Sequence, residues 1–181
     1  RRLTLHRFTN IEEYLAYVEE HPAEIDALTK DLLICVTSFF RDEEAFHALD
    51  AVIRRIVEDK GEGASIRVWV PGCATGEEAY SIALLFARAL GDRFESTNLS
   101  VFGTDIDADA IAHARRGLYP DASLVNVDQD LVQRFFRRKE GGLQAVKSLR
   151  ERLIFAKQDV IQNPPFSRLD LISCRNLLIY L

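Results

Sequence analysis

The sequence predicts an α/β fold, a parallel sheet with helices packed against it, preceded by a small all-helical module. Three observations support this prediction. Residues 66–70 alternate apolar side chains as a strand does, and a glycine turn separates them from a helical repeat. Three later segments, residues 99–107, 153–159 and 169–176, begin apolar and end polar, which is typical of parallel strands with a site at their carboxyl ends. Residues 9–60 show only helical periodicity.

Composition limits what kind of protein this is. The chain has 181 residues, 48% of them hydrophobic, which suffices for one domain with a helical appendage. The formal net charge of −5 argues against nucleic acid as a partner, and no apolar run is long enough for membrane insertion. Cys35, Cys73 and Cys174 lack metal-site spacing, so we expect a reduced, cytoplasmic location and no metal. Because the chain begins with two arginines and has no methionine, we expect it to be a piece of a longer protein.

The helical module is expected over residues 1–60. Asn10 is typical of a helix N-cap, and Pro22 suits the first position of a second helix. Asp42 is expected to cap a third helix. A Gly-Glu-Gly linker follows, and the α/β domain is expected over residues 65–181.

The stretch between the second and third helices, residues 37–42, combines polar, aromatic and basic side chains. We interpret Phe39 and Phe40 as apolar plugs that hold this loop on its neighbour. Arg41 follows two aromatic residues in a short loop and is well placed to meet an anion. Arg41 is therefore a candidate binding residue.

The glycine turn after the first strand is the clearest candidate site. Gly72 and Gly76 are expected to let a ligand approach the backbone, and the following helix offers free N–H groups. Glu77 and Glu78 would repel a pyrophosphate but suit a cationic ligand, which favours S-adenosylmethionine and disfavours a nicotinamide oxidoreductase. The alternative for Glu77 is that it only complements the helix dipole.

The second strand ends in two acids with different expected roles. Asp105 lies where adenosine-binding folds use a carboxylate to bind ribose hydroxyls. Asp107 suits the N-cap of the next helix.

An insertion over about residues 118–152 interrupts the α/β pattern. A hairpin is expected around Gly141 and Gly142, but the insertion is short, so a three-stranded subdomain is not expected here. Eight basic residues and two acids lie between Arg134 and Lys157. This basic run is either a solvated face or a docking patch for an acidic partner.

The last strand, residues 169–176, ends in Arg175 and Asn176. Four parallel strands make an incomplete sheet with both faces to cover. Either more strands follow in the full protein or another molecule completes the sheet.

Four motifs in this order resemble the chemotaxis receptor methyltransferases of the CheR family. They are T-S-F-F-R-D from residue 37, G-C-A-T-G-E-E-A-Y-S from residue 72, G-T-D-I-D from residue 103 and S-C-R-N-L-L-I-Y from residue 173. The resemblance covers the whole chain. It implies a Rossmann-like class I methyltransferase sheet, truncated at its C-terminal end, that transfers methyl groups from S-adenosylmethionine to receptor glutamates and releases S-adenosylhomocysteine.

The resemblance also implies the site residues. Cofactor contacts carried over to this sequence fall on Thr37, Arg41, Glu77, Asp105, Asp159, Val160, Arg175 and Asn176, and Gly72 and Gly76 of the glycine turn complete the candidate cofactor-binding residues. Arg41 and Tyr180 match residues at the methyl-transfer centre.

The implied partner is the cytoplasmic helical bundle of a chemoreceptor. The last motif looks most like the branch in which this domain is fused to methylesterase and sensor or kinase modules. A second hypothesis is a non-catalytic module that senses S-adenosylmethionine or its product, or that docks a partner, within such a protein.

Overall fold

The computed structural model describes residues 2–32, 37–61 and 63–180, apart from a few side chains within them. The chain forms two compact units, Arg1–Cys35 and Val36–Leu181. The expected linker at residues 61–63 lies inside the second unit, because the helix before it packs on the sheet domain.

Between residues 2 and 32, the first unit holds the helices α1 (Arg2–His6), α2 (Ile11–Glu20) and α3 (Pro22–Leu32). Asn10 caps α2 as expected, since its Oδ1 accepts a hydrogen bond of 2.8 Å from the Glu13 backbone N–H. Pro22 takes the first position of α3, also as expected.

A buried carboxylate joins the helices of the first unit. Glu24 is only 6% exposed and accepts hydrogen bonds from Arg2 Nε at 2.8 Å and from the Tyr14 hydroxyl at 2.9 Å. His6 Nε2 lies 3.1 Å from the same carboxylate. A buried charge needs such partners, so the fold of this small unit depends on the ionised state of Glu24.

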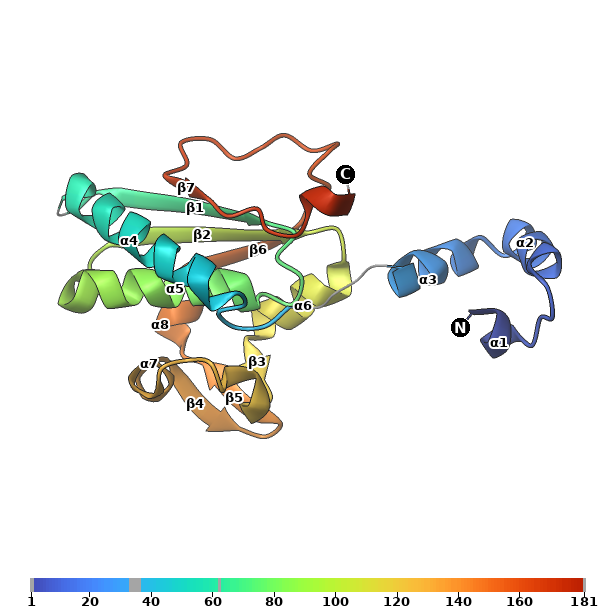
Figure 1. The fold of residues 1–181 in the computed structure, drawn as a ribbon, viewed down its shortest axis with the longest axis horizontal. Helices are drawn as coiled ribbons and strands as arrows, with labels where there is room; N and C mark the ends of the chain where they lie inside the picture. The colour runs from blue at the N-terminus through green and yellow to red at the C-terminus, as the bar shows by residue number, and fades with distance from the viewer. Residues whose placement is uncertain (1, 33–36, 62, 181) are drawn as a thin grey trace. The chain divides into compact units, whose positions relative to one another are not determined.

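A four-stranded parallel sheet forms the centre of the second unit, in the order β6-β2-β1-β7. Figure 1 shows α4 and α5 crossing in front of it. The strands are β1 (Ser65–Pro71), β2 (Asn98–Asp105), β6 (Leu153–Lys157) and β7 (Leu171–Ile172). All four expected strands are present, but the last one is reduced to two residues because the chain before it runs as a loop.

One face of the sheet packs on helices α4 (Glu43–Lys60), α5 (Glu77–Leu90) and α6 (Ala108–Arg116). Alternate strand residues such as Val68 and Val101 are fully buried in this core. Helix α5 contributes more buried side chains than α4 or α6, ten besides Glu77. Asp107 caps α6 as expected, accepting 2.8 Å and 3.3 Å bonds from the N–H groups of Asp109 and Ala110.

The opposite face carries aromatic residues covered by the loop before β7. Phe166 stacks on Phe102 with ring centroids 4.5 Å apart and meets Trp69 edge-on at 5.6 Å. The Trp69 indole N–H donates to Thr104 Oγ1 at 3.0 Å. The loop therefore buries the second face at β1 and β2, while Ile154 on β6 is still 46% exposed.

The insertion forms a small antiparallel sheet, which Figure 1 shows apart from the parallel one. Its strands, in the order β3-β5-β4, are β3 (Leu118–Tyr119), β4 (Phe136–Lys139) and β5 (Gly142–Ala145). The hairpin expected at Gly141 and Gly142 is confirmed. The expectation that the insertion is too short for three strands is wrong, because β3 needs only two residues to pair with β5.

Short helical segments complete the second unit. They are η1 (Gly91–Phe94), η2 (Asp121–Leu124), α7 (Gln129–Phe135), α8 (Lys147–Arg150) and η3 (Leu178–Tyr180). The basic run crosses this region, and several of its arginines bind backbone carbonyls. Arg152 donates to Thr97 O at 2.7 Å and to Glu95 O at 2.9 Å. Such arginines link segments that are distant in sequence. The docking role of the basic run stays a prediction.

Candidate functional site

The residues expected to form the site follow the carboxyl ends of four adjacent parallel strands. Because these ends share one edge of the sheet, segments that are far apart in sequence meet there. The segments begin with Gly72 after β1, Asp105 at the end of β2, Asp159 after β6 and Arg175 after β7. The structure thus brings together the segments that the sequence nominated.

The glycine turn is shaped by its protein neighbours. Gly72 and Gly76 have positive φ angles of 66° and 99°. A Cβ atom at Gly72 would lie 3.2 Å from the side chain of Leu177, and one at Gly76 would lie 2.8 Å from Ala114 Cβ and 3.0 Å from the Tyr119 hydroxyl. The need for glycine at position 76 therefore comes first from packing against α6 and β3, not only from room for a ligand.

Asp105 braces the turn from the neighbouring strand. Its Oδ2 accepts a 2.8 Å hydrogen bond from the Ala74 N–H, and its Oδ1 accepts a 2.9 Å bond from the Asp107 N–H. Each carboxylate oxygen has a further lone pair. Asp105 can therefore hold the turn and still accept hydrogen bonds from hydroxyl groups, as the ribose role requires.

The two acids at the start of α5 have different environments. Glu77 is 8% exposed, and its Oε2 accepts a 2.7 Å bond from Thr75 Oγ1. Glu78 accepts a 2.7 Å bond from Ser173 Oγ, and its Oε2 lies 3.7 Å from Arg175 Nη1. Burial raises the pKa of Glu78, although Ser173 and the charges of Arg175 and Arg41 oppose the rise.

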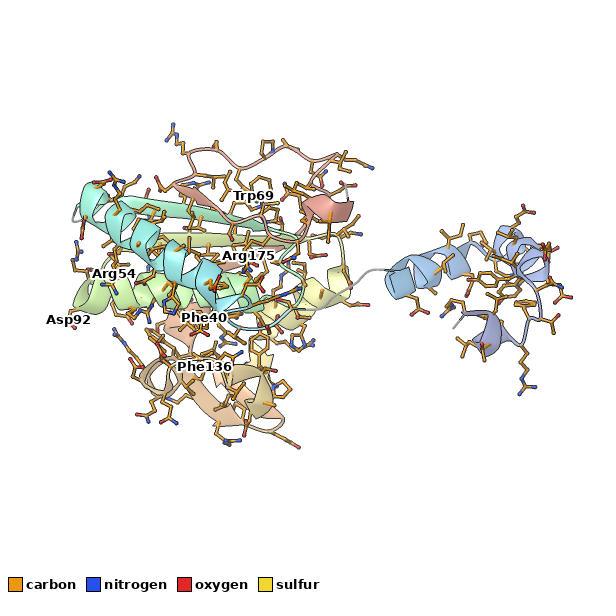
Figure 2. All side chains as sticks on the ribbon, in the orientation of Figure 1. Phe40, Arg54, Trp69, Asp92, Phe136 and Arg175 are labelled. Carbon is orange, nitrogen blue, oxygen red and sulfur yellow. The ribbon has the colours of Figure 1, made fainter. Side chains whose placement is uncertain are left out.

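Arg175 lies beside the start of α4, as Figure 2 shows. Its Nη2 pairs with Asp42 Oδ2, and its guanidinium lies 5.2 Å from the centre of the Phe46 ring. Its Nη1 is buried and has no hydrogen-bond partner within residues 2–32, 37–61 and 63–180. Asn176, next in sequence, is exposed and has a left-handed backbone with φ of 57°. An unsatisfied guanidinium donor fits a ligand that carries a carboxylate.

Asp159 and Val160 form a tight turn after β6. The carboxylate of Asp159 accepts a 2.9 Å bond from the Ile161 N–H and a 3.3 Å bond from the Gln162 N–H. Asn163 Oδ1 accepts a 2.9 Å bond from the Asp159 N–H. This carboxylate therefore shapes the loop, and its expected role beside an adenine stays a prediction.

The arginine-bearing loop is held firmly on the α/β unit. Phe39 is fully buried, 4.9 Å from the Tyr119 ring and 6.1 Å from the Phe136 ring, between centroids. The Phe40 N–H donates to Ser81 Oγ at 3.0 Å. The interpretation of these aromatic residues as plugs is confirmed, and they fix the backbone on either side, at Thr37 and Arg41.

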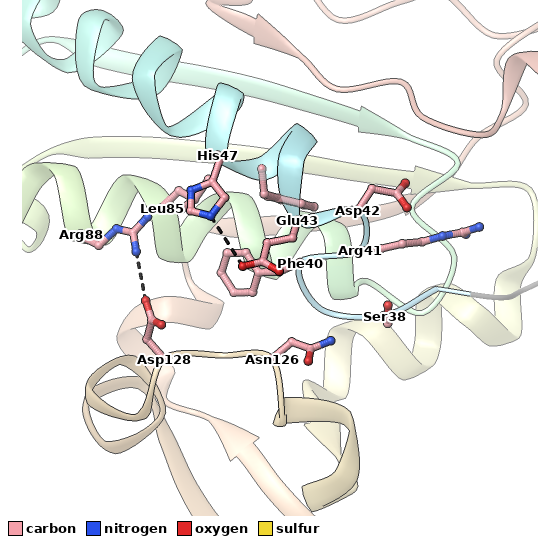
Figure 3. A pocket seen from close by; sticks show the side chains of 11 residues that line it. Ser38, Phe40, Arg41, Asp42, Glu43, His47, Leu85, Arg88, Asn126 and Asp128 are labelled. Atoms are coloured by element: carbon pink, nitrogen blue, oxygen red, sulfur yellow. Dashed lines mark hydrogen bonds and ion pairs between the residues drawn. The ribbon is translucent and has the colours of Figure 1, made fainter.

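A cavity of about 380 Å³ opens beside this loop, between α4, α5 and the segment before α7. Figure 3 shows Arg41 extending away from His47 at one side of it. Polar contacts line the other side, with Arg88 Nη1 3.0 Å from Asp128 Oδ2 in an ion pair and His47 Nε2 3.6 Å from Glu43 Oε1. The cavity is polar and lies next to the candidate anion-binding arginine.

Other chemistries find less support among the described residues. They contain no cluster of three or more histidine, cysteine or acidic side chains able to hold a metal, and no helix long and apolar enough to cross a membrane. Burial raises the pKa of the Cys73 and Cys174 thiols, which keeps both as weakly nucleophilic thiols. Tyr180 ends η3, and its side chain lies outside the described part of the structure.

The site therefore combines carboxylates that suit a cation, an arginine with an unsatisfied donor and a carboxylate suited to a ribose. Residues 35–181 match the family described as CheR methyltransferase, SAM binding domain. The chain belongs to this family. The CheR family, the α/β sheet and the S-adenosylmethionine cofactor expected from the sequence are thereby confirmed.

Curated relatives resemble the chain over nearly its whole length. "Chemotaxis protein methyltransferase 2" of Pseudomonas aeruginosa is 32% identical over 99% of this chain and 65% of the relative. "Chemotaxis protein methyltransferase" of Escherichia coli is 32% identical over 99% of this chain and 63% of the relative. An uncharacterized 104.1 kDa protein of Rhodobacter capsulatus is 35% identical over 99% of this chain, which matches 19% of that protein. The chain thus spans less than two thirds of the length of the chemotaxis methyltransferases it matches.

Sequence reasoning missed the polar contacts that join the segments of the CheR site. Asp42 takes the expected N-cap position of α4, but its side chain makes no capping bond and pairs with Arg175 instead. Ser173 and Glu78 were not expected to meet. Both residues lie in motifs that contain other candidate site residues, and this was the one signal in the sequence that could have drawn attention to them. Only the folded chain shows that they are partners.

Proposed function

We propose that this chain is the catalytic part of an S-adenosylmethionine-dependent O-methyltransferase that methylates glutamate carboxylates of chemoreceptors. The observation that carries the proposal is the meeting of Glu77, Asp105 and Arg175 at one edge of the sheet in a chain of the CheR family. The names of the relatives support the reaction and the receptor substrate.

The residue roles form part of the proposal. Glu77 and Asp105 serve the cationic and ribose parts of the cofactor, and Arg175 serves its carboxylate. The buried Nη1 of Arg175, which has no hydrogen-bond partner among the described residues, supports this last role. The remaining proposed cofactor contacts are Thr37, Arg41, Gly72, Gly76, Asp159, Val160 and Asn176.

The chemistry asks the protein mainly for positioning. Bound S-adenosylmethionine supplies a methyl group on a sulfonium. A glutamate carboxylate is already ionised at neutral pH, so no general base is needed. Arg41 orients that carboxylate without neutralising it, and Tyr180 packs at the methyl group. The cavity beside Arg41 supports this assignment, because it offers room for a polar segment of the receptor.

The proposed partner is the cytoplasmic helical bundle of a chemoreceptor, and the proposed location is the cytoplasm. We also propose that the full protein carries methylesterase and sensor or kinase modules. The length of the Rhodobacter capsulatus relative, of which this chain matches 19%, is compatible with further domains.

Transfer of radiolabelled methyl groups from S-adenosylmethionine to a chemoreceptor fragment tests the function. The label is expected in base-labile methyl esters of the receptor. Arg41→Ala is expected to lower turnover strongly, whereas Arg55→Ala, an exposed arginine on α4, leaves it unchanged. Calorimetry measures cofactor binding separately.

Two results would contradict the proposal. Near-normal turnover of Arg41→Ala would remove its catalytic role. Binding of S-adenosylmethionine without any transfer would favour the sensing or docking module instead.

A further inference from the structure

Two carboxylates from distant parts of the chain hold the Arg175 guanidinium. Asp42 pairs with Nη2, and Glu78 Oε2 lies 3.7 Å from Nη1. The Phe46 ring lies against the same group, 5.2 Å away. Because Glu78 also accepts a 2.7 Å bond from Ser173, the loop after β7 is tied to α5 at two points and to the start of α4 at a third.

Asp42 pairs with Arg175 and does not cap helix α4. It occupies the N-cap position of α4, where an aspartate ordinarily binds the backbone N–H groups of the first turn. It makes no such bond, and its φ of 62° lies in the left-handed region. The ion pair with Arg175 is thus the interaction that its side chain makes in place of a helix cap.

The contact with Asp42 involves only one end of the Arg175 guanidinium. Asp42 takes Nη2, whereas Nη1 has no hydrogen-bond partner within residues 2–32, 37–61 and 63–180. Glu78 Oε2 lies 3.7 Å from the buried Nη1, so a ligand carboxylate that binds Nη1 shares it with Glu78, while Asp42 keeps its ion pair with Nη2. Asp42 therefore holds the Arg175 side chain in place and does not compete with the ligand for Nη1.

We propose that Asp42 is a positioning residue of the cofactor site, which joins the loop carrying Arg41 to the loop carrying Arg175. The inference rests on the proposed function, because it takes Arg175 as a ligand of the cofactor carboxylate. Asp42 follows Arg41 directly, so one ion pair fixes the backbone next to both arginines. Fixing two binding groups before the ligand arrives lowers the ordering that binding requires.

Calorimetric titration of S-adenosylhomocysteine into the variants of this chain tests the proposal. Asp42→Asn keeps the size of the side chain and tolerates the left-handed backbone, but it removes the charge. We expect its Kd to rise about fivefold at low salt, the upper range for a partly exposed pair, with a smaller rise in 1 M salt. Asp42→Glu is expected to restore part of the affinity. Glu44→Gln, which removes the same charge from an exposed residue of α4, leaves Kd unchanged.

A double mutant separates positioning from general structural damage. In an Arg175→Lys background, Asp42→Asn is expected to change Kd by less than in the parent chain, because the guanidinium it holds is gone. Equal effects in both backgrounds would overturn the proposal. An unchanged Kd in Asp42→Asn would also overturn it, and a tighter Kd would show that Asp42 competes with the ligand.

These outcomes are distinct from failure of the proposed function. The parent chain could bind S-adenosylhomocysteine and yet transfer no methyl groups. In that case the Kd values of the Asp42 variants still decide whether Asp42 is a positioning residue. If the parent chain does not bind the product, the cofactor assignment and the inference are both overturned.

Discussion

Replacing Gly76 by alanine tests whether this glycine serves packing or ligand access. The new Cβ would lie 2.8 Å from Ala114 Cβ and 3.0 Å from the Tyr119 hydroxyl, at a φ of +99°. The left-handed backbone costs an alanine roughly 1–2 kcal/mol. Forcing a methyl group into a packed contact costs roughly 1–3 kcal/mol more. We therefore expect Gly76→Ala to lower the free energy of unfolding by about 2–5 kcal/mol.

Gly91→Ala is a control without a packing contact. Gly91 also has a positive φ, +57°, and a Cβ there would meet nothing within 4 Å. Its ψ of −120° lies outside the left-handed helical region that Gly76 adopts, so its loss of stability is a backbone contribution alone, roughly 1–3 kcal/mol. A larger loss in Gly76→Ala than in Gly91→Ala indicates the contact with Ala114 and Tyr119.

Urea unfolding gives the free energies, and titration of S-adenosylhomocysteine gives the affinity of each folded variant. Equal losses of stability in Gly76→Ala and Gly91→Ala would refute the packing argument. If Gly76→Ala has normal stability but no longer binds S-adenosylhomocysteine, this glycine serves ligand access, as the sequence suggested.

Three further predictions concern other parts of the chain. Phe39→Ala should lower unfolding free energy by roughly 3–5 kcal/mol in urea titrations, because this ring is fully buried, whereas half-buried Phe40→Ala should cost less. Arg152→Ala should cost roughly 1–3 kcal/mol, since it leaves carbonyl acceptors unpaired, while Arg138→Ala, in an exposed pair with Asp121, should cost under about 1 kcal/mol in the same assay. Hydrogen bonds from Arg2 lower the pKa of Glu24 from 4.5 to about 2. Its stabilisation of α1–α3 should therefore be full above pH 4.5 and lost as the pH falls toward 2, measured by amide hydrogen exchange. Glu24→Gln should remove this pH dependence, and an unchanged dependence would contradict the assignment.

Local patterns made much of the second unit predictable. Strand alternation at Val68 and Val70, helical spacing after Glu77 and the cap at Asp107 all depend on neighbours a few residues away. Such signals do not depend on the rest of the fold. The order of the candidate residues after successive strands also follows from the sequence, since parallel strands present their carboxyl ends at one edge.

Pairings across long separations could not be predicted in the same way. The third strand of the small sheet has only Leu118 and Tyr119, too few for a periodic signal, and it forms because β5 lies beside it. Asp42 fits the sequence pattern of a helix cap, yet its carboxylate pairs with Arg175, 133 residues further along the chain.

The sequence by itself determined the α/β class, the family, the cofactor type and which segments meet at the carboxyl edge of the sheet. These follow from periodicity, turns and motifs, which act over short distances along the chain. Only the tertiary structure decided which partner each polar group takes: Ala114 opposite Gly76, Ser173 on Glu78, and Asp42 on Arg175. The physical reason is that burial and charge pairing depend on distances in space, which the folded chain alone fixes.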